Sequence, residues 1–320
     1  MMCEHCFASA NENHENRDLP DNDFLLLFGQ ILRPEVRAIS FTGGEPLMRS
    51  GLVIEMLNRI KTTGITTTLN SNGWFLDNSV ATRLEESGLS QVQVSLDSSI
   101  PEKHDAFRKK EGSYRHVMGA IRNCANNGLP IYARVTITSF NYNEMTSILH
   151  LVQENGGQGI IVKTLVPSGR GQNSDSRPSR EQQISAITSI VEAVKTCPNA
   201  TNEKVKFLTP SYPFLIDSQL IKYSDPCECG DKLAFISSSG NVQPCGYTHY
   251  VLGNLNETSL EDIWNKSPFL LNWRKKRLNG KCLSCRFSAQ CNGGCRAAAY
   301  ETSGSLDTVD PLCWRAEECL

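Results

Sequence analysis

The stretch RAISFTGGEP at residues 37–46 decides how this chain folds. It runs as a short apolar strand and then stops at a pair of glycines, Gly43 and Gly44. The segment 52–64 follows with apolar residues at helical spacing, and the β-branched segment 66–73 ends in a turn signal. A strand, a helix and a second strand in this order predict a βαβ unit with a parallel sheet.

The same alternation of strand-like and helix-like segments continues to residue 169. We expect further helices at 78–88, near 114–127 and near 143–154, and further strands at 91–97, 131–137 and 159–169. The chain is therefore predicted to be an α/β protein whose parallel sheet curves into an open or partial barrel. The chemistry of such sheets lies at the carboxyl ends of the strands. Polar turns fall at these ends: TGGEP at 42–46, NSNG at 70–73 and SLDSS at 95–99.

A polar loop, GRGQNSDSRPSR at 169–180, precedes one more helix. Ser179 is the expected N-cap of that helix, and Gln182 closes a capping box with it. Beyond residue 205 the sequence becomes irregular, broken by prolines and then rich in cysteine. This change of pattern predicts a boundary between two domains near 200–220.

We predict a first domain over 1–200, a linker over 201–225 and a cysteine-rich domain over 226–320. Inside the last domain a short helix is expected at 258–266, with Thr258 and Glu261 as its capping box. A chain of this length is long enough to bury a large core in two such domains.

The composition is that of an ordinary globular protein, with 39% apolar and 21% charged residues and a formal net charge of −2. This balance argues against a basic surface for nucleic acid or anionic membranes, so neither partner is expected. The longest strongly apolar run, Phe24–Phe28, is far too short to span a bilayer, and no signal-peptide pattern is recognised. We therefore expect a cytoplasmic protein.

Thirteen cysteines need an explanation in that compartment, because the reducing cytosol disfavours disulfides. Regular spacing in the last third of the chain favours metal ligation instead, by zinc or by iron–sulfur clusters. One zinc site needs four ligands, whereas this array offers enough thiols for two four-thiolate centres. The array is Cys227, Cys229, Cys245, Cys282, Cys285, Cys291, Cys295 and Cys313. Cys124, Cys197 and Cys319 lack partners at such spacing and are interpreted as buried or incidental thiols.

The order of these thiols, with Gly240 between Cys229 and Cys245, resembles the seven-cysteine signature of the SPASM extension of radical S-adenosylmethionine (AdoMet) enzymes. The motif TGGEP resembles that family's AdoMet amino-group loop, and SNG at 71–73 and SLD at 95–97 resemble its ribose and carboxylate contacts. The stretch GNLNETSLEDIWN resembles the segment between the two cysteine groups of the family. The resemblance covers essentially the whole chain. It implies a partial (β/α)6 TIM-like barrel of the radical SAM type followed by a small cysteine-rich SPASM domain.

The family's radical-generating cluster is bound by the pattern Cys-x3-Cys-x2-Cys, and Cys3 and Cys6 match its second and third cysteines. The first cysteine would lie four residues before Cys3, ahead of Met1. We therefore expect a truncated gene product or a misassigned start, because the AdoMet motifs further along the chain are intact. The alternative is a natural variant without this cluster. On either interpretation the 320-residue chain is expected not to cleave AdoMet.

The resemblance also assigns the AdoMet contacts. Glu45 is expected to hold the α-amino group, in a loop shaped by Gly43, Gly44 and Pro46. The remaining candidates are Ser71 and Asn72 for the methionine carboxylate and ribose, Ser95 and Asp97 for the ribose hydroxyls, Arg134 for the carboxylate, and His5 for packing near AdoMet. The alternative for these residues is ordinary turn or loop chemistry.

The stretch 103–114 is expected to be structural, with His104, Arg108 and Gly112 positioning the next helix. The loop VPSGRG at 166–171 is expected to wrap the adenine end of AdoMet. Cys3 and Cys6 are the implied ligands of the radical-generating cluster. The family implies a first auxiliary [4Fe–4S] cluster on Cys229, Cys245 and Cys295, completed by Cys227, and a second on Cys282, Cys285, Cys291 and Cys313.

The implied activity is that of a radical SAM oxidoreductase or maturase, which cleaves AdoMet reductively to a 5′-deoxyadenosyl radical and oxidatively modifies a substrate. An electron donor such as flavodoxin or ferredoxin would then be a partner. The favoured substrate is a peptide or protein, and the alternative is a tetrapyrrole side chain in a haem-type pathway. A second alternative is a non-catalytic zinc or iron–sulfur binding protein. A dehydrogenase is not expected, since no Gly-x-Gly-x-x-Gly follows a strand.

Overall fold

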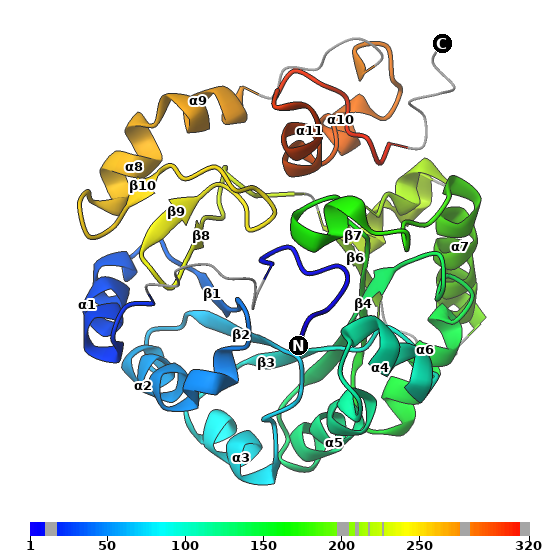
Figure 1. The fold of residues 1–320 in the computed structure, drawn as a ribbon, viewed down its shortest axis with the longest axis horizontal. Helices are drawn as coiled ribbons and strands as arrows, with labels where there is room; N and C mark the ends of the chain where they lie inside the picture. The colour runs from blue at the N-terminus through cyan, green and yellow to red at the C-terminus, as the bar shows by residue number, and fades with distance from the viewer. Residues whose placement is uncertain are drawn as a thin grey trace. The chain divides into compact units, whose positions relative to one another are not determined.

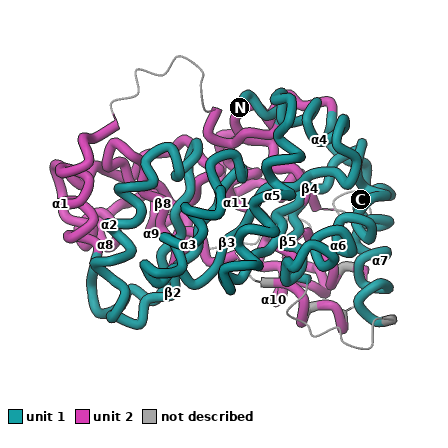
Figure 2. Tube along the Cα trace, turned by 90° about the horizontal axis from the view of Figure 1, so that it is seen from below, with its two compact units in different colours: residues 1–4, 32–163, 176–206 teal, residues 5–31, 164–175, 207–320 magenta. Residues whose placement is uncertain are grey.

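The structure is a computed structural model that describes residues 1–9, 18–196, 205–208, 211–216, 218–225, 227–275 and 282–313. Cys197 and Cys319, which the sequence identifies as thiols without partners, lie outside the described residues. Contacts divide the chain into two compact units, drawn in two colours in Figure 2. The barrel unit contains residues 1–4, 32–163 and 176–206. The cysteine unit contains residues 5–31, 164–175 and 207–320.

The main sheet follows the alternation predicted from the sequence. Its strands are β1 (Ala38–Phe41), β2 (Thr66–Ser71), β3 (Gln91–Ser95), β4 (Ile131–Ile137), β5 (Gly159–Thr164), β6 (Val205–Leu208) and β7 (Ser224–Asp225), in that spatial order. Neighbouring strands run parallel, with Phe41 beside Leu69, Leu69 beside Val92 and Val94 beside Ala133. The predicted partial barrel is confirmed: the parallel sheet curls into a half-barrel.

Helices connect the strands of the barrel unit and lie on the outer side of the curled sheet (Figure 1). They are the 3-10 turn η1 (Pro46–Arg49) and the helices α2 (Ser50–Ile60), α3 (Asn78–Glu86), α4 (Pro101–Arg108), α5 (Ser113–Asn126), α6 (Met145–Glu154) and α7 (Arg180–Thr196). Alternate residues of β4 are completely buried, namely Ile131, Ala133, Val135 and Ile137. This apolar core is continuous enough to fix the carboxyl ends of β1 to β4 in space.

The capping box predicted at the start of α7 is confirmed. The backbone N–H of Ser179 donates to Gln182 Oε1 at 2.8 Å, and the N–H of Gln182 donates to Ser179 Oγ at 3.3 Å. Gly112 stands directly before α5 with φ 78°, a backbone conformation that glycine adopts without strain. Asp105 satisfies the first turn of α5, since its carboxylate accepts the N–H groups of Gly112 at 2.6 Å and Tyr114 at 2.7 Å.

The cysteine unit contains far less regular structure. Its helices are α1 (Asp21–Ile31), α8 (Leu260–Lys266), α9 (Pro268–Arg274), α10 (Ser288–Cys291) and α11 (Arg296–Ser303), with 3-10 turns η2 (Gly169–Asn173), η4 (Pro213–Leu215) and η5 (Ser218–Tyr223). Its small antiparallel sheet has the order β10 (Gly253–Asn254), β9 (Asn241–Gln243), β8 (Phe235–Ile236). The capping box predicted for Thr258 and Glu261 is wrong by one residue. Ser259 is the N-cap of α8, and its hydroxyl accepts the N–H of Asp262 at 3.2 Å.

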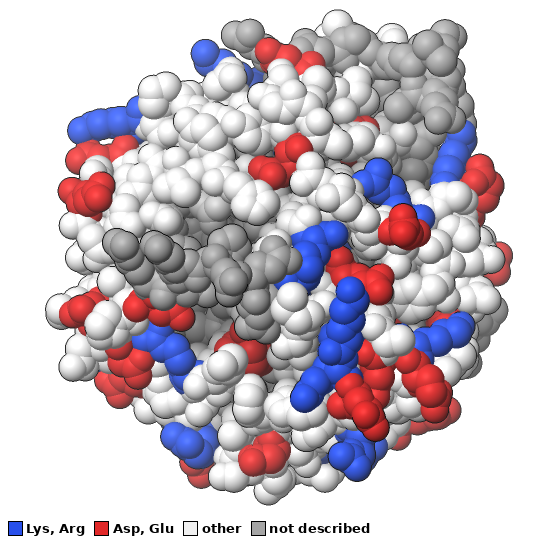
Figure 3. All heavy atoms as spheres, viewed as in Figure 1, with Lys and Arg blue, Asp and Glu red and all other residues white. Residues whose placement is uncertain are grey.

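The surface agrees with the nearly balanced composition. On the face drawn in Figure 3, acidic and basic side chains of the described residues are interspersed rather than gathered by sign. None of the helices in the described part of the chain is both long and apolar enough to cross a membrane.

Candidate cofactor sites

Two polar loops meet at the carboxyl ends of β1 and β2 in the barrel unit. Glu45 follows β1 through two glycines and serves as the N-cap of η1, where its Oε1 accepts the Leu47 N–H at 3.1 Å. The same carboxylate accepts the hydroxyl of Ser71 at 2.8 Å and the N–H of Asn72 at 2.7 Å. Gly43 has φ 134°, outside the range of most side-chain-bearing residues. The motifs TGGEP and SNG are thus one constellation.

The electrostatics of Glu45 suit a cationic ligand. Burial raises the pKa of its carboxyl group above the ordinary value, and the donors on Asn72, Ser71 and Leu47 offset part of that rise. The side chain is only partly buried, so a ligand can still approach it. A carboxylate held by fixed donors beside two strand ends can bind an ammonium group by a charge-assisted hydrogen bond.

Arg134 of β4 brings a positive charge to the same end of the sheet. Its Nη1 donates to Asn70 Oδ1 at 2.8 Å, and burial lowers the pKa of the guanidinium below the ordinary value. Ser95, the last residue of β3, is the register neighbour of Arg134. Arg134, in the middle of β4, therefore lies level with the carboxyl end of β3. A guanidinium held by an amide oxygen rather than by a carboxylate keeps its charge available to an anionic group.

Asp97, which is expected to contact the ribose, is engaged in a buried ion pair. Its side chain is completely buried, forms an ion pair with the Arg108 guanidinium, and accepts the N–H of Thr136 at 3.1 Å. Arg108 also donates to Cys3 Sγ at 3.7 Å, and its Nε has no hydrogen-bond partner among the described residues. The contact expected between Asp97 and the ribose stays a prediction. The charge of Asp97 holds Arg108 beside Cys3.

The titration behaviour of this buried pair follows from its charges. Burial alone would lower the pKa of Arg108, but Asp97 and Cys3 outweigh it and the pKa is raised. His104 is also buried, and its Nδ1 accepts the Asp97 N–H at 3.2 Å. Burial, together with the nearby Arg108 charge, lowers the pKa of His104 to about 4, so this histidine is neutral near pH 7. His104 and Arg108 thus both contact Asp97, and their expected role in positioning the next helix stays a prediction.

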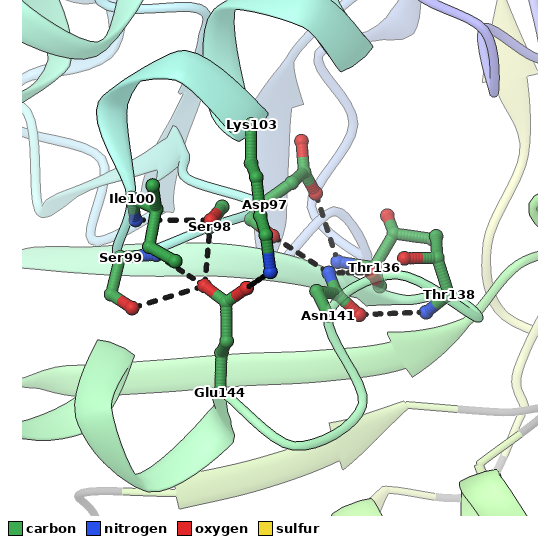
Figure 4. Close-up of polar contacts among 9 residues, drawn as sticks. All are labelled: Asp97, Ser98, Ser99, Ile100, Lys103, Thr136, Thr138, Asn141 and Glu144. Carbon is green, nitrogen blue, oxygen red and sulfur yellow. Dashed lines mark hydrogen bonds and ion pairs between the residues drawn. The ribbon is translucent and has the colours of Figure 1, made fainter.

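A second network fixes the loop after β3, and sequence reasoning missed it (Figure 4). Glu144 accepts from Ser98 Oγ at 2.6 Å, from the N–H of Ser99 at 2.9 Å and from Lys103 Nζ at 2.9 Å. Burial raises the pKa of Glu144, but these donors more than offset it and the pKa lies below the ordinary value. Asn141 donates to the Asp97 carbonyl at 2.7 Å. No periodic pattern indicates these partners, because they are 41 to 46 residues apart in the sequence.

The loop at 166–171 contacts the segment that contains Cys6, within the cysteine unit. The N–H of Arg170 donates to the Cys6 carbonyl at 3.0 Å. A Cβ atom on Gly169 would lie 2.5 Å from that carbonyl oxygen, so only glycine allows this approach. Phe7 packs its ring against Tyr247 with centroids 4.8 Å apart. His5, expected near AdoMet, is half-buried in the same segment.

The first of two thiol groups surrounds Cys229. Hydrogen bonds with the Cys227 and Cys245 thiols, followed by burial, raise the pKa of Cys229 well above its ordinary value. Cys295 is buried, and its pKa is raised well above the ordinary value by burial, by Asp310 and by the nearby Cys245 and Cys227. The structure therefore brings Cys295 near the cysteines that lie far before it in the sequence.

The turn that carries Cys229 is held by α9, which the sequence did not single out. The indole N–H of Trp273 donates to the Cys229 carbonyl at 2.9 Å, and Arg274 Nε donates to the Gly230 carbonyl at 2.8 Å. Trp273 is almost completely buried. Its ring leaves no room for a side chain at Gly230, where a Cβ atom would lie 2.6 Å from it.

The second thiol group surrounds Cys291. Burial, followed by the negative charges of its neighbours, raises the pKa of Cys291 to about 12; these neighbours are Asp310, Cys313, Cys282 and Cys285. Phe287 and Tyr212 belong to an apolar cluster that packs against Cys285 and Cys291. Among the described residues, no three His, Cys, Asp or Glu side chains stand at the mutual spacing of a bound metal ion.

These arrangements fit the cofactors that the motifs imply. The Glu45 carboxylate and the Arg134 guanidinium are complementary to the ammonium and carboxylate of an amino acid. The unpartnered Nε of the buried Arg108 lies on a side chain that already donates to Cys3. Two groups of neighbouring thiols offer the donor set that iron–sulfur clusters use.

A half-barrel with polar strand ends, followed by thiol-rich turns, defines an α/β enzyme that depends on a nucleoside-type cofactor and on metal clusters. Comparison with protein families matches residues 1–152 to the Radical SAM superfamily and residues 227–286 to an iron–sulfur cluster-binding domain, SPASM. The chain is therefore a radical SAM enzyme with a C-terminal SPASM domain, as the sequence resemblance indicated. Its cofactors are AdoMet and iron–sulfur clusters.

Characterised relatives align with nearly the whole chain. An AdoMet-dependent heme synthase of Nitratidesulfovibrio vulgaris is 28% identical over 98% of this chain and 88% of its own length. The mycofactocin maturase MftC of Mycobacterium tuberculosis is 27% identical over 98% of this chain and 79% of its own length. The chain is thus similar both to an enzyme named as a heme synthase and to an enzyme named as a maturase.

Solved structures share the fold. Native anSMEcpe with bound AdoMet superposes with a TM-score of 0.78 at 17% identity, covering 99% of this chain and 91% of that one. Streptococcus suis SuiB bound to its precursor peptide SuiA gives a TM-score of 0.77 at 18% identity, covering 98% and 72%. At these identities the likeness establishes the architecture alone.

Proposed function

We propose that this enzyme, once the third cysteine of the family signature is supplied, cleaves AdoMet reductively and oxidatively modifies a substrate through the radical so formed. The observation that carries the proposal is the convergence of Glu45, Ser71 and Asn72 in one hydrogen-bonded constellation at the carboxyl ends of β1 and β2. This is where parallel α/β sheets bind their ligands. The two thiol groups of the cysteine unit support the same conclusion.

Each residue at the strand ends has a proposed role toward AdoMet. Glu45 binds the α-amino group, and the loop of Gly43, Gly44 and Pro46 lets the ligand approach the backbone. Arg134 binds the carboxylate. Ser71 and Asn72 contact the methionine carboxylate and the ribose, and His5 packs near AdoMet. Ser95 and Asp97 serve the ribose hydroxyls, and Asp97 also holds Arg108 in place.

The proposed metal ligands are Cys3 and Cys6 for the radical-generating cluster and the two thiol groups for auxiliary clusters. Cys3 and Cys6 would contribute to holding a [4Fe–4S] cluster, which when bound would supply the one-electron chemistry for cleaving the sulfonium bond of AdoMet. The chain's own residues orient AdoMet and the substrate C–H bond and keep water away from the radical. Flavodoxin or ferredoxin is the proposed electron donor, and the cytoplasm the proposed compartment.

The substrate we propose is a peptide, so that the enzyme is a peptide maturase. The alignment of the mycofactocin maturase MftC over 98% of this chain supports this choice. A tetrapyrrole side chain is the second candidate. Its support is the AdoMet-dependent heme synthase alignment, which covers the same share of this chain at 28% identity.

The proposal is tested on anaerobically reconstituted protein. Since the family signature has a third cysteine, the assay uses both the 320-residue chain and a version lengthened to place a cysteine four residues before Cys3. We expect brown protein with iron and sulfide near equal amounts, and 5′-deoxyadenosine from the lengthened version under reducing conditions. Colourless protein containing zinc would contradict the proposal.

The role of Glu45 is tested by AdoMet binding in the lengthened protein. Replacing Glu45 by Gln removes the charge that binds the ammonium group, and AdoMet should bind at least about tenfold more weakly, the equivalent of about 1.4 kcal/mol. The matched control is Glu55→Gln, the same change on the exposed face of α2. Equal affinities of the two variants would exclude Glu45 from the site.

The substrate class is tested by two parallel incubations with the active enzyme. One contains short peptides encoded beside its gene, and the other contains haem precursors with propionate side chains. Mass loss from a peptide supports the maturase, and mass loss from a tetrapyrrole side chain supports the second candidate.

A further inference from the structure

Asp310 is a buried carboxylate of the cysteine unit that is surrounded by hydrogen-bond donors. It is buried, with 1% of its surface exposed. Its Oδ2 accepts the N–H of Cys295 at 2.8 Å and the hydroxyl of Tyr212, and its Oδ1 accepts the N–H of Leu312 at 2.9 Å. Three donors around one carboxylate suit its ionised form, which only accepts hydrogen bonds.

These contacts join the two thiol groups. Cys295 belongs to the group around Cys229, whereas Cys313 belongs to the group around Cys291. Asp310 holds the first through its side chain, and its backbone carbonyl accepts the N–H of Cys313 at 3.0 Å. One residue thus fixes a cysteine backbone from each group.

Tyr212 extends the contact toward the second group. Its hydroxyl donates to Asp310, while its ring belongs to the apolar cluster that packs against Cys285 and Cys291. The buried tyrosine therefore transmits the position of the Asp310 carboxylate to the thiols of the second group. The hydrogen bond between them offsets part of the free-energy cost of burying both polar groups.

The backbone near Asp310 is shaped to receive it. Gly294 has φ 79°, and a Cβ atom on it would lie 2.5 Å from Asp310 Oδ2. A side chain at this position would displace the carboxylate from the N–H of Cys295. The glycine directly before Cys295 therefore serves the same contact.

We propose that Asp310 is a shared positioning residue for both auxiliary clusters, with its carboxylate fixing Cys295 of one and its backbone fixing Cys313 of the other. This inference rests on the proposed function, since it requires both thiol groups to bind iron. Groups that orient metal ligands through hydrogen bonds affect metal retention and reduction potential without touching the metal. The negative charge of Asp310 also opposes the addition of an electron to either cluster.

The test measures each auxiliary cluster by itself. All proteins contain Cys3→Ala and Cys6→Ala, so that iron at the N-terminal site does not contribute. One background adds Cys282→Ala and Cys285→Ala and keeps the first thiol group. The other background adds Cys229→Ala and Cys245→Ala and keeps the second thiol group.

Asp310→Asn is then introduced into each background. In both we expect iron to be retained about tenfold more weakly against a chelator, the usual effect of losing a group that orients a metal ligand. In both we also expect a more positive reduction potential, because a nearby negative charge is gone. The matched control is Asp307→Asn, the same change at an exposed position of the same segment, which should alter neither quantity.

The possible results separate the inference from the function on which it rests. If neither parent background binds iron, the proposed function fails and the inference fails with it. If both parents bind iron and Asp310→Asn changes one background or neither, the inference alone is overturned. If circular dichroism shows that Asp310→Asn unfolds the protein, the inference is tested with the variant Tyr212→Phe instead. It removes one donor at constant shape and should shift both reduction potentials, and unchanged potentials would overturn the inference.

Discussion

The two units of the molecule hold their functional groups in different ways. In the barrel unit, the polar residues at the strand ends are anchored by a regular parallel sheet whose β4 side chains alternate into a dry core. In the cysteine unit, the thiols sit on turns between strands of two or three residues and helices of four to eight residues. The comparison suggests that the barrel unit is organised before its cofactor arrives, whereas the cysteine unit depends on metal for its order.

Removal of iron is expected to produce the largest difference in stability between the two units. A chelator and a reductant should strip reconstituted protein, and the amides of 227–275 should then exchange with solvent at least about 10,000-fold faster, roughly 5.5 kcal/mol of local stability. The amides of β2, β3 and β4 should change little, because no proposed metal ligand lies on these strands. Hydrogen exchange with mass spectrometry resolves the two regions. Equal loss of protection in both would show that the units do not differ.

The buried ion pair of the barrel unit provides the next test. Arg108→Met leaves the Asp97 carboxylate buried without its charge partner, and the barrel unit should lose about 3–5 kcal/mol of stability toward urea. The matched control is Arg59→Met, which breaks an exposed pair with Glu55 and should cost about 0–1 kcal/mol. Adding Asp97→Asn to Arg108→Met should recover part of the loss, since the uncompensated charge is gone. A loss no larger than that of the control would mean that water reaches Asp97.

The pH dependence of the barrel unit comes from His104. Its pKa is about 4 in the folded protein against an ordinary 6.5, so between these values the unfolded chain binds a proton that the folded chain does not. Stability is therefore full above pH 6.5 and falls by about 3 kcal/mol as the pH drops to 4. His104→Asn keeps an acceptor for the Asp97 N–H and should remove this slope. Urea unfolding of both proteins at several pH values measures it, and parallel curves would refute the assignment.

The sequence predicted the barrel unit well because its signals are local. The strand at 131–137 and the turn at 43–44 depend mainly on the residues within them, so their sequence patterns are enough to predict them. The capping box at Ser179 was predicted for the same reason, while that of α8 was displaced by one residue because Thr258 and Ser259 are both good caps.

The long-range partners were beyond sequence reasoning. The sequence did not indicate that Asp97 is buried in an ion pair with Arg108. Glu144 and Asp310 gave no signal, because an isolated acidic residue in a sequence is usually a solvated one. Their partners lie 46 and 98 residues away, at Ser98 and Tyr212, and only the fold brings them together.

Two helix N-caps, one in each unit, give the smallest expected effect. They compare the units through the same kind of hydrogen bond, from a backbone N–H to a capping side chain. Asp77 caps α3 of the barrel unit by accepting the Val80 N–H at 2.8 Å, and Ser259 caps α8 of the cysteine unit. In iron-loaded protein, Asp77→Ala and Ser259→Ala should each cost about 1 kcal/mol of local stability, measured by hydrogen exchange of the capped helix. In iron-free protein, Asp77→Ala should still cost the same, whereas Ser259→Ala should cost nothing, because α8 already opens with its unit. If Ser259→Ala costs the same with and without iron, α8 is stable without metal, and the contrast between the two units is confined to the thiol turns themselves.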